Sequence, residues 1–84
     1  MATENIGFRF RLKFGQVVRK RRQAIGISQE ELADRCNLHR TYISEIERGL
    51  KTVSLVSLLR IAEALDLPAH TLIEEVEFLM RDQK

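Results

Sequence analysis

Apolar residues recur every three or four positions along most of the chain, which is the spacing of helices that bury one face. The first such stretch, RLKFGQVVRKRRQAIG, predicts a helix that ends at Gly26, because glycine readily forms the left-handed turn that closes a helix. The inner face of this helix is predicted to hold Phe14, Val17 or Val18, Arg21 and Ile25.

The stretch FRFRLKF, which overlaps the start of this helix, alternates apolar and basic residues with the period of a strand. The sequence predicts no second strand that could pair with it. We therefore expect residues 1–9 to form a flexible N-terminal arm and the helix to begin near Phe10 to Leu12, within a single domain over residues 10–84. In an alternative interpretation, Phe8 and Phe10 dock on the core or on a second subunit.

Two short helices separated by a tight turn are predicted next. Ser28 can cap the first, SQEELADRC, and Glu31 three residues later completes the pattern of a reciprocal capping box. Leu32 and Ala33 face inward in this helix. Asn37 is among the few residues other than glycine that tolerate a positive φ, which suits it to the turn that follows.

The second short helix is expected over residues 40–48, before Gly49. Its apolar stripe consists of Ile43 and Ile46, with partial help from Tyr42 and Leu38, and the rest of its surface is polar or charged. Two isoleucines are a narrow anchor for a helix, so the polar face requires a separate explanation.

Two further helices complete an all-α domain of five helices. Ser54 can cap the fourth helix, whose wide buried face is predicted to be Leu55, Leu58, Leu59, Ile61, Ala62 and Leu65. Pro68 suits the first turn of a fifth helix. The apolar stripe of that helix is Leu72, Ile73, Val76, Leu79 and Met80.

Composition and charge exclude several classes of protein. The chain is 44% hydrophobic and 31% charged, as ordinary globular chains are. The apolar runs are too short to cross a bilayer and the first residues lack the order of a secretory signal, so we expect a cytoplasmic protein. Cys36 is the single cysteine, and the two histidines lack partners at metal spacing, so no metal or cofactor is expected.

The charge is distributed unevenly along the chain. Residues 1–22 carry seven basic side chains and one acidic, a net charge of +6, whereas residues 52–84 carry three basic and six acidic, a net charge of −3. A one-sided basic field attracts polyanions such as nucleic acids. The alternative is that these charges only solvate helix faces.

The two short helices joined by a tight turn suggest a helix-turn-helix. SQEELADRCNLHRTYISEIERG, together with SLLRIAEALDL, resembles the lambda-repressor-like, or XRE-type, DNA-binding domains over about residues 14–67. The residues in the register of that family are Gln29, Ala33, Ile43, Ser44, Ile46, Glu47, Gly49, Leu58, Ala64 and Leu65. Within the family, NLHRTYISEIERG is most similar to the controller proteins of bacterial restriction-modification systems. That resemblance implies regulation of the chain's own gene and of an endonuclease gene.

Helix-in-groove docking explains the polar face of the segment over residues 40–48, because its outward side chains would enter a major groove. Arg40 is the first candidate for base contact, since its guanidinium can reach O6 and N7 of guanine together. Thr41 can touch a thymine methyl group or a phosphate. Glu45 can accept from cytosine, orient Arg40 or exclude wrong sequences. The Tyr42 hydroxyl either reaches the DNA or packs.

Phosphate contacts are expected to position this helix without reading sequence. Gln29 can bind phosphate at the start of its helix, where amides and the helix dipole favour an anion. The other candidates are Ser44, Arg48, Lys51, Thr52, Arg19 and Lys20. The family resemblance implies an internal salt bridge between Arg22 and Glu47, in which Arg22 does not touch DNA.

His39 occupies the position that caps the third helix, where the family usually has Ser, Thr or Asp. An imidazole can accept a hydrogen bond there but is a poor cap, so either Asn37 compensates or His39 faces phosphate. In the second case, protonation of His39 would tighten DNA binding. A third possibility is an exposed histidine without a role.

One such domain contacts too few base pairs for selectivity in a genome, so we expect a homodimer on a palindromic operator, with two reading helices about 34 Å apart. The predicted interface is Leu65, Leu67, Leu72, Ile73, Val76, Leu79 and Met80, and the alternative is that this stripe folds back on its own chain. The predicted function is transcriptional regulation, with double-stranded DNA and RNA polymerase as candidate partners and no small-molecule ligand. The alternatives are a phage-type repressor, an antitoxin-type regulator and a protein-interaction module that uses the fifth helix. An enzyme has the least support, because no nucleophile is flanked by a recognisable acid and base.

Overall fold

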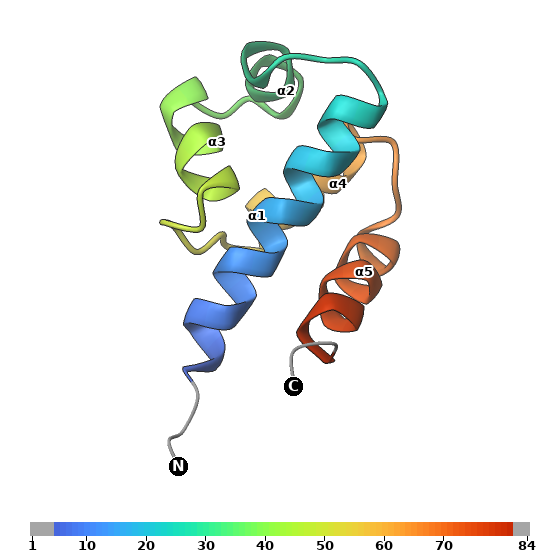
Figure 1. The fold of residues 1–84 in the computed structure, drawn as a ribbon. Helices are drawn as coiled ribbons and strands as arrows, with labels where there is room; N and C mark the ends of the chain where they lie inside the picture. Colours follow the sequence, from blue (N-terminus) through green and yellow to red (C-terminus); the bar gives the residue numbers. More distant parts are fainter. Residues whose placement is uncertain (1–4, 82–84) are drawn as a thin grey trace.

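The computed structural model describes residues 5–81, which form five helices and no strand (Figure 1). The helices are α1 (Ile6–Ala24), α2 (Gln29–Cys36), α3 (Arg40–Glu47), α4 (Leu55–Ala64) and α5 (Ala69–Arg81). The predicted all-α class is therefore confirmed. None of the helices in this part of the chain combines the length and the apolarity needed to span a membrane.

α1 begins at Ile6, so the prediction of an arm that extends to residue 9 is wrong for residues 6–9. Residues 1–4, which were also predicted to belong to this arm, lie outside the described part of the chain. Asn5 caps the helix, because its side-chain oxygen accepts a hydrogen bond from Phe8 N at 3.0 Å. Phe10 stacks on Phe14 one turn later, with ring centroids 5.3 Å apart. The predicted alternative that Phe10 docks on the core is confirmed, whereas Phe8 is half exposed.

The close approach of α1 and α3 depends on Gly15. A β-carbon at this position would lie 2.6 Å from Glu47 O, which is closer than real β-carbons approach a backbone oxygen. The absence of a side chain lets α3 lie directly against α1, and Figure 1 shows α3 beside the upper half of α1. This crossing fixes the orientation of α3.

The core lies between all five helices. Its fully buried large side chains are Phe14, Val18, Leu32, Ile43, Ile46, Ile61, Leu65, Leu72 and Val76. Of the face predicted for α4, Leu58, Ile61, Ala62 and Leu65 are buried as expected. Leu55 and Leu59 are exposed by 79% and 56%, so their predicted burial is wrong. They lie four residues apart, on a side of α4 that no other described helix covers, next to Val56.

α5 packs against α1 and α4. Leu65, Leu72 and Val76 have no exposed surface, which contradicts their prediction as interface residues, because the chain's own core already covers them. The other predicted interface residues, Leu67, Ile73, Leu79 and Met80, are partly buried against the same core. The alternative, in which the stripe folds back on its own chain, is the arrangement in the structure. An amphipathic stripe has the same sequence pattern in both cases.

Two arginines bind the carbonyl groups at the end of α4. Arg21 Nε donates to Leu65 O at 3.0 Å, and Arg35 Nη1 donates to Ala64 O at 3.1 Å. The last carbonyls of a helix carry partial negative charge, so both contacts are favourable. They tie α1 and α2 to α4 and thereby hold α2 beside the core.

Candidate nucleic-acid interface

α2 begins at a capped end. Ser28 Oγ accepts a hydrogen bond from Glu31 N at 3.0 Å, as predicted. The reciprocal half of the predicted capping box is not among the hydrogen bonds of the described residues. Instead, the Glu31 carboxylate accepts from Arg35 Nη2 at 3.2 Å, one turn along the helix. A single hydrogen bond of the box therefore suffices to start α2.

The turn between α2 and α3 has the predicted geometry. Asn37 lies in the left-handed region, with φ of 57°. His39 caps α3, and its Nδ1 accepts a long hydrogen bond of 3.4 Å from Thr41 N. The sequence left the role of His39 open, and in the structure its imidazole forms this cap. This contact requires Nδ1 to be unprotonated, because a protonated ring nitrogen cannot accept.

α3 has one buried and one solvent-facing side. Ile43 and Ile46 are completely buried, which confirms the predicted anchor. Arg40 and Thr41 are exposed at the start of the helix, and Glu45 is half-buried. Figure 1 shows α2 and α3 at one end of the molecule, away from α5. The candidate base-reading side chains thus project from a helix whose inner side is fixed.

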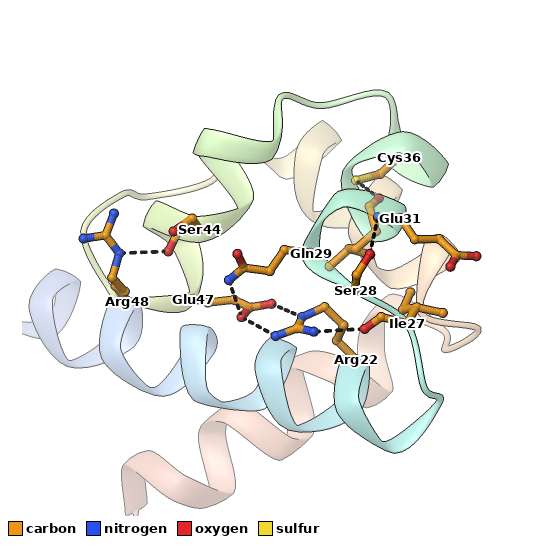
Figure 2. A network of polar contacts seen from close by, with 10 residues as sticks. Arg22, Ile27, Ser28, Gln29, Glu31, Cys36, Ser44, Glu47 and Arg48 are labelled. Atoms are coloured by element: carbon orange, nitrogen blue, oxygen red, sulfur yellow. Dashed lines mark hydrogen bonds and ion pairs between the residues drawn. The ribbon is translucent and has the colours of Figure 1, made fainter.

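A hydrogen-bonded network joins α1, α2 and α3 at this end of the molecule (Figure 2). Arg22 Nε and Nη2 donate to the two carboxylate oxygens of Glu47, at 2.6 and 3.0 Å. The predicted salt bridge is confirmed, and it is nearly inaccessible to solvent, with side-chain exposures of 11% and 2%. Arg22 Nη1 also donates to Ile27 O at 2.9 Å. Because each nitrogen of this guanidinium has a protein partner, Arg22 has a structural role.

Gln29 belongs to the same network, which the sequence did not reveal. Its Nε2 donates to Glu47 Oε1 at 3.0 Å, and Figure 2 shows the side chain pointing towards Glu47. One amide hydrogen is thereby used inside the protein. Gln29 can still donate its second amide hydrogen to a phosphate, beside the free N–H groups at the start of α2.

The loop after α3 carries three of the predicted phosphate-binding residues. Arg48, Lys51 and Thr52 are all exposed. Arg48 Nε donates to Ser44 O at 3.4 Å. The Tyr42 hydroxyl donates to Thr52 O at 3.4 Å, so this side chain ties the loop back to α3. Of the two roles considered for Tyr42, packing within the protein is thus observed in the free chain.

The two predicted phosphate-binding residues on α1, Arg19 and Lys20, are both exposed. Lys20 lines a groove between α1 and α5 together with Glu74 and Glu75, on the side of α1 that faces α5. The structure therefore does not bring Lys20 together with the α3 surface.

Cys36 packs in the hydrophobic core. Cys36 is buried, and its thiol donates to Leu32 O at 3.0 Å. Burial raises the pKa of the Cys36 thiol, which disfavours the reactive thiolate. Within residues 5–81, no three side chains of His, Cys, Asp or Glu are grouped so that they could hold a metal ion.

The capped helix α2, the tight turn at Asn37 and the two-sided helix α3 define a helix-turn-helix domain. The helix-turn-helix family model matches residues 18–72, which is more than half of the chain. The chain therefore belongs to the helix-turn-helix family of DNA-binding transcriptional regulators, as the resemblance predicted.

Individual relatives agree with this assignment. The control protein C.BamHI of Bacillus amyloliquefaciens is 49% identical over 65 residues, which are 76% of this chain and 80% of that protein. The transcriptional regulator SinR of Bacillus subtilis is 36% identical, over 73% of this chain and 56% of that protein. The crystal structure of the restriction-modification controller protein C.AhdI from Aeromonas hydrophila superposes with a TM-score of 0.72 at 47% identity, over 74% of this chain and 94% of that chain.

Proposed function

We propose that the chain regulates transcription as a homodimer on a palindromic operator, and that it serves as the controller protein of a restriction-modification system. The observation that carries the proposal is the exposed polar side of α3, whose inner side is held by two completely buried isoleucines. The likeness to C.BamHI and to C.AhdI supports the controller role over a phage-type repressor or an antitoxin-type regulator. The proposed activity is binding and not catalysis.

In the proposed complex, α3 lies in the major groove with its first turn towards the bases. Arg40 donates to a guanine, and Thr41 contacts a neighbouring base or phosphate. The start of α2, with Gln29, binds one stretch of the DNA backbone through its free N–H groups. Lys51 and Thr52 bind the backbone at the other end of α3.

The dimer contact is proposed to be the apolar surface of α4, formed by Leu55, Val56 and Leu59, in place of the α5 stripe. These residues are 56–79% exposed, whereas the stripe of α5 faces its own core. α4 follows α3 after a loop of a few residues, so a two-fold contact through α4 sets the spacing of two α3 helices directly. Burying such side chains in a dimer contributes roughly 1.5–3 kcal/mol each.

Selection of bound sequences from random duplexes, followed by a salt titration of the recovered duplex, tests the proposal. We expect a symmetric consensus and an affinity that falls steeply with salt. A consensus without symmetry, or affinity that is independent of salt, would contradict it and favour a protein-interaction module. Activation of transcription would in addition require contact with RNA polymerase, which footprinting of the polymerase with and without the chain would detect.

The proposed dimer surface has a matched control. Leu59 on α4 and Phe78 on α5 are exposed to similar extents, 56% and 58%. In sedimentation, Leu59→Glu should be monomeric at concentrations where the parent and Phe78→Glu are dimeric. Dissociation by Phe78→Glu alone would move the interface to α5.

A further inference from the structure

The first turns of α1 contact the end of α3, although they lie outside the residues that the family model matches. Arg11 Nε donates to Gly49 O at 3.3 Å. Gly49 has φ of +77° and packs closely on α1, because a β-carbon there would lie 2.9 Å from Leu12 Cδ2 and 3.2 Å from Leu12 Cα. Gly49, the residue that follows the last turn of α3, therefore packs directly against α1.

Gly49 is also the point at which the chain leaves α3. Its N–H donates to Ile46 O at 3.0 Å, and Leu50 N donates to Glu45 O at 2.9 Å. These two hydrogen bonds close the C-terminal end of the helix. The direction of the loop that carries Lys51 and Thr52 is set here.

The guanidinium of Arg11 has a second partner on its own helix. It lies over the ring of Phe8, with Cζ 5.9 Å from the ring centroid. A cation at this distance from an aromatic face is attracted to it, which restricts the side chain. Arg48, the C-cap residue of α3, donates to Ser44 O in the last turn, and Arg11 adds a second positive charge at the negative end of that helix through its bond to Gly49 O.

We propose that Arg11 is a positioning residue for DNA binding: through Gly49 it fixes the end of α3 and the loop, so that Lys51 and Thr52 face the DNA backbone. The DNA-binding role of Lys51 and Thr52 in this proposal rests on the proposed function. Since backbone contacts do not read sequence, loss of Arg11 weakens binding to every duplex and leaves the preference between duplexes unchanged.

The test compares Arg11→Met with Lys13→Met. Both variants remove one positive charge from the same part of α1 and keep an unbranched apolar stem. Lys13 lies two residues from Arg11 and thus roughly 200° further round the helix. Affinity is measured for the duplex recovered by selection and for a scrambled duplex of the same length. For Arg11→Met we expect both affinities to fall about fivefold, the size of one lost hydrogen bond, and for Lys13→Met less than twofold.

Hydrogen exchange of the free protein provides the second readout. The amides of Gly49 and Leu50 should exchange faster in Arg11→Met, while the amide of Leu65 in the core should keep its protection. Phe8→Ala, which leaves Arg11 in place, should shift the same two amides by a smaller factor.

Three results would overturn the proposal. Weaker DNA binding with unchanged exchange at Gly49 and Leu50 would mean that Arg11 contacts DNA itself. Faster exchange with unchanged binding would mean that the loop position is unimportant. A changed preference between the two duplexes would mean that Arg11 takes part in reading. If the parent chain binds neither duplex, the proposed function fails, whereas the exchange data still report on the contact between Arg11 and Gly49.

Discussion

Replacement of Glu47 with leucine should destabilise the domain more than any surface substitution. Leucine keeps most of the volume of the side chain but removes the acceptors of three hydrogen bonds, two from Arg22 and one from Gln29. The guanidinium of Arg22, only 11% exposed, would remain without a counter-charge. The cost comes from this stranded charge and not from a cavity.

The structure sets the size of the effect. Removing one partner of a buried, hydrogen-bonded ion pair costs about 3–5 kcal/mol, and small domains have about 5–15 kcal/mol of stability in total. A domain of this size loses roughly 4–8 °C of melting temperature per kcal/mol. The melting temperature should therefore fall by at least about 12 °C.

Chemical unfolding of Glu47→Leu, Arg22→Met and the double variant is the appropriate assay. Since the double variant has no stranded charge, it should be more stable than the sum of the single effects predicts, by about 1 kcal/mol or more. The pair of Glu31 and Arg35 is the internal control, because its side chains are 51% and 38% exposed. Glu31→Gln should change stability by less than about 0.5 kcal/mol. Additive single effects, or equal effects at both pairs, would refute the reasoning.

Three further outcomes follow from the structure. Gly15→Ala should destabilise the domain by about 1–3 kcal/mol in thermal unfolding, because the new methyl group overlaps the carbonyl oxygens of α3. Gly7→Ala is the control on the same helix, since a β-carbon there makes no contact below 3.3 Å. Equal melting temperatures of the two variants would count against the close crossing of α1 and α3. His39→Ser should stabilise the chain by about 0.5–1 kcal/mol in urea unfolding, since serine caps better than an imidazole at 3.4 Å from Thr41 N, and a loss of stability would argue against the cap. Burial raises the pKa of the Cys36 thiol, which disfavours the thiolate in the folded chain. At mildly alkaline pH, iodoacetamide should therefore alkylate the urea-unfolded chain much faster than the native chain. Similar rates would show that the thiol of the native chain is accessible.

Local signals in the sequence were sufficient to predict α2, the turn and α3. The cap at Ser28, the left-handed Asn37 and the two buried isoleucines each depend on neighbours a few residues away. Reliance on local signals also explains the wrong start predicted for α1, because two such signals disagree there. The alternation in FRFRLKF has the period of a strand, whereas the capping side chain of Asn5 marks a helix.

Contacts between distant segments were less accessible to sequence reasoning. An apolar stripe shows that a helix face is covered but not by what, so Leu72 and Val76 were assigned to a second subunit although α1 and α4 cover them. Leu55 and Leu59 follow the apolar pattern of α4 and were therefore assigned to the core, although no described helix covers them. Arginine side chains are long enough to reach several helices, and the contacts of Arg11, Arg21 and Arg35 with carbonyl oxygens leave no pattern in the sequence.

The central claim is that the exposed side of α3 reads DNA sequence, and binding by Arg40→Ala tests it most directly. The parent, Arg40→Ala and Arg48→Ala are each titrated with the selected duplex and with variants that change one base pair at a time. We predict that Arg40→Ala, still folded, loses roughly 1–3 kcal/mol of discrimination at one base pair in each half-site. Arg48→Ala should weaken binding to all duplexes equally. Arg40→Ala that discriminates between the duplexes as well as the parent does would contradict the claim.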